Sequence, residues 1–201
     1  MNTEEIKDGI PAFYAPSQEA WRAWLAANHD RESKVWLIMY LKSSDMPSIA
    51  WSDAVDEALC FGWIDSKTVK RDAQSRYQYY CPRKPKSIWS KINKAKIERL
   101  IAEGKMTAAG MRVVDLAKEN GSWSSIDDIE EGLMPDDLQA AMEAEPAALA
   151  NFQAFSHSAR KLLNYWVASA KRPETRAQRI AIVVSEAAAG RRANQVQPKK
   201  E

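Results

Sequence analysis

The chain has 201 residues, a net charge of +2, and apolar (45%) and charged (28%) fractions that are ordinary for a globular protein. Seven glycines and nine prolines exclude a collagen-like or low-complexity chain, and two cysteines are too few for a disulfide framework. No apolar run approaches the ~18 residues of a membrane span, and the first 30 residues lack the apolar core of a signal peptide, so we expect a cytoplasmic protein without membrane insertion.

The first part of the chain mixes strand and helix patterns. Ser17, Ser52, Ser87 and Thr107 each precede an apolar-periodic stretch and are candidate helix N-caps. β-Branched and aromatic runs predict a buried strand and then a hairpin with a polar turn, so that residues 33–81 hold all the strands. The predicted elements are a helix over 18–28, a strand over 34–42, a helix over 52–61, strands over 63–69 and 76–81, and helices over 87–103 and 107–119.

The second part of the chain shows helix patterns and no strand pattern. Residues 122–134 have the character of a connection, and three of the four helices that follow begin with proline. Those helices are predicted over 135–144, 146–155, 158–171 and 173–189. Strands followed by helices indicate an α+β protein, with a small antiparallel sheet and helices in the N-terminal part and an all-helical C-terminal part. The predicted domains are an α+β domain over 1–121, a helical domain over 135–190 and a disordered tail over 191–201.

Charge is segregated along the chain. Residues 65–105 hold twelve Lys/Arg against four acids, residues 115–145 hold ten acids against one lysine, and residues 160–192 hold eight Lys/Arg against two acids. Such blocks can steer an anionic ligand to one face. The acidic block can equally lie across the basic blocks, or all three can be solvated surface.

The most distinctive segment is PRKPKSIW, over residues 82–89. Two prolines stiffen it, and Arg83, Lys84 and Lys86 place three cations on an extended loop that runs into a helix N-terminus. This combination suits phosphate, carboxylate or a nucleic-acid backbone. The alternative is a basic surface loop that neutralises nearby acids.

The helix that follows carries polar residues within its apolar arc. On a helical projection with 100° per residue, Asn93 and Lys96 lie within the arc that Trp89 and the aliphatic residues occupy. A buried amide or ammonium costs free energy unless it is paired, so we expect Lys96 to reach a carboxylate of residues 53–65, or an anion. The candidate acids are Asp53, Glu57 and Asp65; alternatively, Lys96 extends to solvent and Asn93 bonds a loop.

No motif for a known reaction, metal or cofactor is present. The two histidines lack zinc-ligand spacing, and Cys60 and Cys81 are expected to be buried thiols. Three functions remain open: binding of an anionic small molecule, a small enzyme with Asp65 or Glu57 and Lys96 in a tryptophan-lined pocket, and weak nucleic-acid binding through the basic block. The candidate binding residues are Trp63, Asp65, Arg83, Lys84, Lys86, Trp89, Asn93 and Lys96.

Four segments carry a family resemblance. They are DEALCFGWID (56–65), PRKPKSIWSKIN (82–93), GKM-TAAG (104–110) and the pattern Y-W-x5-K-R-P-E-T-R-x3-I (165–180). Over about residues 13–190 the chain resembles the family named for YdeI and OmpD-associated proteins, the bacteriocin-protection family. The resemblance implies a bacterial protein linked loosely to resistance against antimicrobial peptides or bacteriocins. It implies no reaction, cofactor or catalytic residue.

Overall fold

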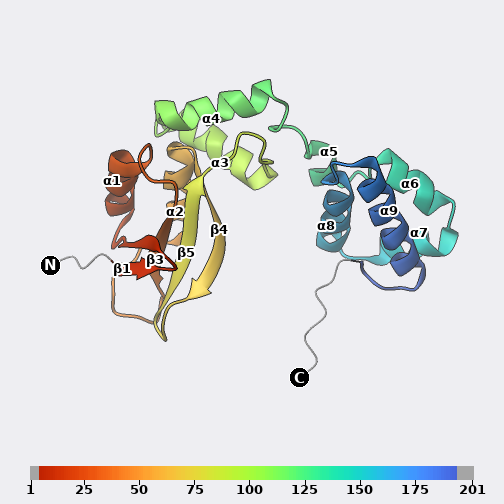
Figure 1. The fold of residues 1–201 in the computed structure, drawn as a ribbon, viewed down its shortest axis with the longest axis horizontal. Coiled ribbons are helices and arrows are strands. Elements are labelled where there is room, and N and C mark those ends of the chain that lie inside the picture. The colour runs from red at the N-terminus through yellow and green to blue at the C-terminus, as the bar shows by residue number, and fades with distance from the viewer. Residues whose placement is uncertain (1–4, 194–201) are drawn as a thin grey trace. The chain divides into compact units, whose positions relative to one another are not determined.

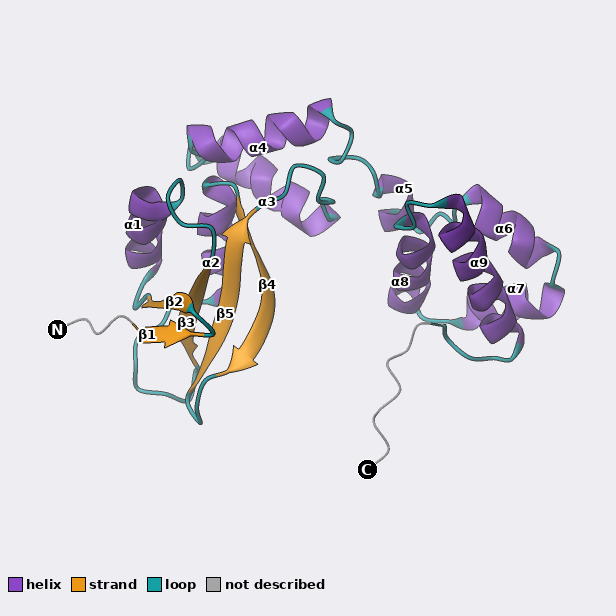
Figure 2. Cartoon of the chain, in the orientation of Figure 1, coloured by secondary structure: helices purple, strands orange, loops and turns teal. Residues whose placement is uncertain are grey.

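The computed structural model describes residues 5–193 and divides the chain into two compact units, one ending at Ser124 and the other beginning at Ser125. Among the described residues, strands occur only in the N-terminal unit, and helices build the C-terminal unit (Figure 2). The α+β class predicted from the sequence is therefore confirmed. From residue 194 onward, the predicted disordered tail lies outside the described residues.

The N-terminal unit, coloured from red to green in Figure 1, is built on a five-stranded sheet with the order β1-β2-β3-β5-β4. β2 and β3 pair in parallel, with α1 between them in the chain, and the other neighbours pair antiparallel. The sheet is thus mixed, where the sequence predicted an antiparallel one. The strands are β1 (Glu5–Lys7), β2 (Ile10–Tyr14), β3 (Val35–Tyr40), β4 (Trp63–Lys70) and β5 (Ser75–Pro82).

The prediction that residues 33–81 hold all the strands is wrong, because β1 and β2 precede them. Asp8 and Gly9 join these strands with positive φ angles of 53° and 71°. A two-residue turn with both residues in this region matches the twist of a hairpin, and the Asp-Gly pair favours it. The sequence contained this signal at the turn, but the flanking strands are too short to show an apolar alternation.

Four helices complete the N-terminal unit: α1 (Gln18–Asn28), α2 (Trp51–Cys60), α3 (Lys91–Ala102) and α4 (Ala108–Glu119). The predicted caps Ser17 and Thr107 are confirmed, since each side-chain oxygen accepts a hydrogen bond from a backbone N–H of the first turn. The predicted caps Ser52 and Ser87 are wrong. α2 begins after Ala50 without a side-chain cap, and α3 begins after Ser90, whose hydroxyl caps it.

The core of this unit lies on both faces of β3. On one face Val35, Leu37 and Met39 pack with buried side chains of α1–α4. On the other face Trp36 and Ile38 pack with Tyr77 and Ile10. Because β3 is buried on both faces, its sequence is a continuous apolar run, which made it easy to predict.

The C-terminal unit has its own core. Leu138, Phe152, Leu163 and Val183 are buried together from four different helices. Among residues 5–193 no helix has both the length and the apolar character needed to cross a membrane. The helices are α5 (Asp127–Glu130), α6 (Asp136–Glu143), α7 (Pro146–Ala154), α8 (His157–Ala168) and α9 (Pro173–Ala188).

Candidate functional site

The residues predicted to bind a ligand lie in different surroundings. Trp63 and Trp89 are fully buried in the core of the N-terminal unit. Lys84 and Lys86 are exposed on the loop before α3, and Asn93 is half-buried in the first turn of that helix. Burial in the core leaves the two indoles without a surface on which a ligand could stack.

The sequence predicted that Arg83 displays its charge on the loop, and this prediction is wrong. It is only 7% exposed, and its guanidinium lies 3.6 Å from the centroid of the Trp89 ring. One terminal nitrogen donates to the carbonyl of Ile88, while the buried Nε has no hydrogen-bond partner among the described residues. Burial lowers the pKa of Arg83 to about 10. Arg83 therefore supports the loop from the inside.

Lys96 forms the contact that its position predicted. Its Nζ lies 2.5 Å from Oδ1 of Asp56 and 2.9 Å from the hydroxyl of Ser52, and Arg99 donates to the other Asp56 oxygen. The partner is Asp56, where the sequence suggested Asp53, Glu57 or Asp65. The predicted apolar arc includes Ile92, Ile97, Leu100 and Ile101, and it is wrong at its two ends: Ile92 and Ile101 are 70% and 43% exposed, whereas Ile97 and Leu100 are buried.

Glu57 also has its partners within the protein. Nη1 of Arg22 and Nε2 of Gln18 each donate to it at 2.6 Å, which joins α1 to α2. The neighbouring Cys60 thiol is buried, which raises its pKa and makes it a poor nucleophile. Together with the Lys96–Asp56 pair, these contacts hold helices together.

A pocket of about 590 Å³ lies elsewhere in the N-terminal unit, between the end of β3, the loop over residues 41–50 and the first residue of α2. Its lining includes two cations, Lys42 and Arg76, and no carboxylate. Lys42 is exposed. The apolar part of the lining includes Met39, Leu41, Met46, Ile49 and Trp51.

Arg76 is the unusual member of this lining. It is partly buried on β5, and its Nε is shielded from solvent without a hydrogen-bond partner. Within the described part of the chain, no carboxylate forms an ion pair with Arg76. A shielded N–H without a partner is unfavourable, so an anion in the pocket would improve the surroundings of Arg76.

Trp51 is held in place at the edge of this pocket. Its indole Nε1 donates to Oδ2 of Asp65 at 2.9 Å, and Nε2 of Gln78 donates to the same oxygen at 3.1 Å. The ring remains 47% exposed. Asp65, a predicted site residue, is not part of the lining and contacts it only through Trp51.

Sequence reasoning missed Arg76 and Lys42 as site residues. Arg76, Gln78 and Tyr80 alternate along β5 toward the helix-covered face of the sheet, but polar and aromatic residues occupy both faces of this strand. The sequence of β5 therefore lacks the alternation of polar and apolar residues that would identify Arg76 as a partly buried arginine. Within the described residues, no group of three or more His, Cys, Asp or Glu side chains could hold a metal ion.

Two family models match the chain. Residues 13–113 match a domain of unknown function, DUF8412, and residues 132–190 match the family described as "Bacteriocin-protection, YdeI or OmpD-Associated". Comparisons with curated proteins and with solved structures gave no match. The second family match confirms the resemblance over residues 132–190, whereas three of the four segments that carried it, before residue 111, lie in the part that matches DUF8412. Residues 132–190 are similar to the YdeI/OmpD-associated family, and, since the first match spans just over half of its residues, the chain belongs to the DUF8412 family.

Proposed function

We propose that the protein binds a small anionic molecule with an apolar body in the pocket beside Arg76. The observation that carries this proposal is a partly buried guanidinium, without an ion pair among the described residues, in the lining of a pocket of about 590 Å³. An arginine offers a carboxylate or phosphate two parallel N–H donors. A ligand anion would supply the counter-charge that the protein does not.

The remaining lining indicates the rest of the ligand. Met39 and Ile49 are buried beside the pocket, and Trp51 presents a fixed aromatic face to it. An apolar body of ring or branched-chain shape would bury against these side chains. Lys42 would attract the anion during approach. We therefore favour an aromatic or branched monocarboxylate over a highly hydrated anion such as sulfate.

The biological setting rests on the family. The description of the C-terminal match names bacteriocin protection, and we propose that ligand binding in the N-terminal unit serves such a protective role. The cytoplasmic location expected from the sequence stays a prediction. Cells expressing Arg76→Gln in place of the wild-type protein should lose protection in a bacteriocin survival assay, at equal protein levels.

The binding proposal is tested by calorimetric titration of the full chain with a panel of aromatic and branched monocarboxylates. We expect at least one ligand to bind the wild type and to bind Arg76→Gln at least tenfold more weakly, because one charge-assisted bidentate contact is worth about 1.5–3 kcal/mol. Lys84→Gln, an exposed cation on the predicted loop, is the matched control and should bind normally.

A second pair of variants tests the role of Asp65. Asp65→Asn keeps an oxygen that can accept from Trp51, whereas Asp65→Ala removes it. Affinity should fall more in the alanine variant than in the asparagine variant if orientation of the indole matters. Equal affinity in both variants and the wild type would contradict this role. In the preceding experiment, loss of binding in Lys84→Gln would indicate that the ligand binds at the loop over residues 82–89.

Weak nucleic-acid binding remains a second candidate because Lys84 and Lys86 are exposed. Such binding should fall steeply with salt, with a slope of roughly −0.9 per phosphate contact on duplex DNA. The enzyme hypothesis gains no support from the geometry, since Arg22 holds Glu57 and Asp56 holds Lys96. Fluorescence titrations of duplex and single strands at two salt concentrations test the nucleic-acid candidate.

A further inference from the structure

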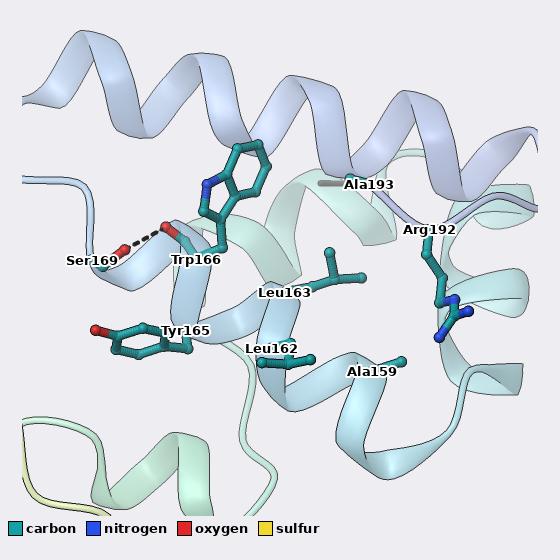
Figure 3. A pocket seen from close by; sticks show the side chains of 8 residues that line it. All are labelled: Ala159, Leu162, Leu163, Tyr165, Trp166, Ser169, Arg192 and Ala193. Atoms are coloured by element: carbon teal, nitrogen blue, oxygen red, sulfur yellow. Dashed lines mark hydrogen bonds between the residues drawn. The ribbon is translucent and has the colours of Figure 1, made fainter. Parts of the chain in front are cut away.

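A second pocket, of about 330 Å³, lies within the C-terminal unit. Figure 3 shows its lining, with Leu162, Leu163, Tyr165 and Trp166 on the α8 helix, Ser169 at one end and Arg192 at the other. Its walls are mainly hydrocarbon and aromatic ring. Tyr165 and Trp166 also open the sequence pattern that carried the family resemblance. No function discussed above uses this pocket.

Trp166 is held in the wall of this pocket through its backbone and through one contact of its ring. The hydroxyl of Ser169 donates to the carbonyl of Trp166 at 2.9 Å, and Nη1 of Arg179 donates to the same carbonyl at 2.6 Å. The Arg179 guanidinium also lies 5.2 Å from the centroid of the Trp166 ring. The contact with Arg179 restricts the indole before binding, so less entropy is lost when a ligand stacks on it.

The chemistry of the lining limits what can occupy the pocket. The Ser169 hydroxyl accepts from Arg179 at 3.0 Å besides donating to Trp166, so its single O–H donor is already used and it can only accept from a ligand. Arg192 stands at one end of the lining, and a charged group placed away from it, among Leu162, Leu163 and the two rings, would lose hydration without full compensation. A flat, uncharged ring would bury apolar surface there and stack on the indole.

The size of the pocket suits a small molecule. Its volume of about 330 Å³ lies at the lower end of the range for small-molecule pockets, which fits one ring-sized molecule. Leu162, at 67% exposed, is the one large hydrophobic side chain in the described part of the lining that is strongly exposed.

We propose that the pocket formed by α8 and residues 192–193 binds a small, uncharged aromatic molecule. This site is separate from the pocket beside Arg76 and differs from it in ligand charge. The C-terminal unit therefore has a ligand site of its own, built around Tyr165 and Trp166.

The test uses the full chain labelled with ¹⁵N-tryptophan, in which each indole N–H gives one NMR signal. Trp166→Phe and Trp51→Phe assign the signals that report on the two pockets. The probes are p-cresol, which is uncharged at pH 7, and 4-methylbenzoate, which has a similar shape and a negative charge. We expect p-cresol to shift the Trp166 signal in a saturable manner, and 4-methylbenzoate to shift it at least tenfold less at equal concentration.

The variant Leu162→Glu places a charge on the wall of the pocket at an exposed position, so it should fold normally and bind p-cresol at least tenfold more weakly. Leu116→Glu, a change at an exposed leucine of the N-terminal unit, is the matched control and should leave binding unchanged. An unmoved Trp166 signal, stronger binding of 4-methylbenzoate at Trp166, or equal p-cresol binding by Leu162→Glu would each overturn the proposal. A shift of Trp51 by 4-methylbenzoate, together with no shift of Trp166 by p-cresol, would overturn it while supporting the proposed function.

Discussion

Two arginines of the N-terminal unit are shielded without a carboxylate partner, and their surroundings differ. The guanidinium of Arg83 is covered by Trp89 and by the loop that it supports. Arg76 lines an open pocket, where a ligand can reach it. A cation–π contact and a carbonyl partly replace lost hydration, which makes Arg83 a structural residue. The same reasoning leaves the charge of Arg76 available for binding.

Lys96→Met should destabilise the N-terminal unit by about 2 kcal/mol, less than the full effect of breaking a buried pair, because Arg99 still neutralises Asp56. Tryptophan fluorescence during urea unfolding measures this change. The signal reports mainly on the N-terminal unit, because Trp166 is the only tryptophan after Ser124. Lys84→Met is the control and should change stability by no more than about 0.5 kcal/mol. If both variants unfold alike, the Lys96–Asp56 pair contributes nothing measurable.

At the scale of single residues, the sequence predicted that Lys96 has a partner but not which one. A lysine inside an apolar arc must pair or reach solvent, and this reasoning needs only helix periodicity. Choosing between Asp53, Asp56 and Glu57 requires the rotation of α2 relative to α3, because successive residues on a helix point 100° apart. That rotation is set by packing with the sheet and with α4.

Among the elements, α2 and α4 approach each other closely at Gly110. A Cβ atom at this position would lie 2.2 Å from the carbonyl oxygen of Cys60, which is backbone and cannot move aside. Gly110→Ala should therefore lower the free energy of unfolding by about 3 kcal/mol or more, which is the upper end of the range for overpacked sites. Ala108→Gly, an exposed change in the same helix, is the control and should cost about 1 kcal/mol or less. A higher urea midpoint for Gly110→Ala than for Ala108→Gly would contradict this crossing geometry.

The edge strand β1 is held to the sheet by a pH-sensitive contact. Arg71 donates to both carboxylate oxygens of Glu5, at 2.9 and 2.7 Å, and Tyr77 donates to the same group. The hydrogen bonds from Arg71 lower the pKa of Glu5. The stabilisation is therefore present above the usual pKa of a glutamate and is lost as the pH falls through the lowered value in the folded protein.

Amide hydrogen exchange of β1 and β2 should accordingly speed up in acid, relative to β3. Glu5→Gln should show the faster exchange already at pH 7 and lose about 1 kcal/mol of local stability, since a bidentate pair exceeds an ordinary surface salt bridge. Its exchange should then differ little from that of the wild type below the folded pKa of Glu5. A constant difference between the two proteins at all pH values would show that the ion pair is not responsible.

Most elements could be predicted from local patterns, and the exceptions have identifiable causes. The β4–β5 hairpin and α4 followed from apolar runs and from a threonine cap. β1 and β2 were missed because three and five residues are too few for periodicity, and only the Asp8-Gly9 turn marked them. α3 was predicted to begin too early because Ser87 and Ser90 are equally good caps, and the contacts of the 82–90 loop decide between them.

On the scale of the whole molecule, the charge blocks pair in part within the C-terminal unit. Glu130 lies 2.5 Å from Lys161, and Asp137 lies 2.5 Å from Arg176, so acids from the middle block meet bases from the last block. The sequence left open whether these blocks pack together or face solvent. At these two positions they pack together, which reduces the charge available to attract a nucleic acid.

The two compact units have separate cores, and this suggests that each can fold alone. Residues 1–124 contain the sheet and the clusters around β3, whereas residues 125–201 bury Leu138, Phe152 and Val183 among their own helices. We expect both fragments, expressed separately, to give dispersed ¹H–¹⁵N spectra whose core signals overlay those of the full chain. The shorter fragment should be the less stable one, because small domains bury a smaller fraction of their surface. Its unfolding can be followed through Trp166. Collapsed signals from residues 125–201 alone would contradict the predicted helical domain and would mean that this core requires the N-terminal unit to form.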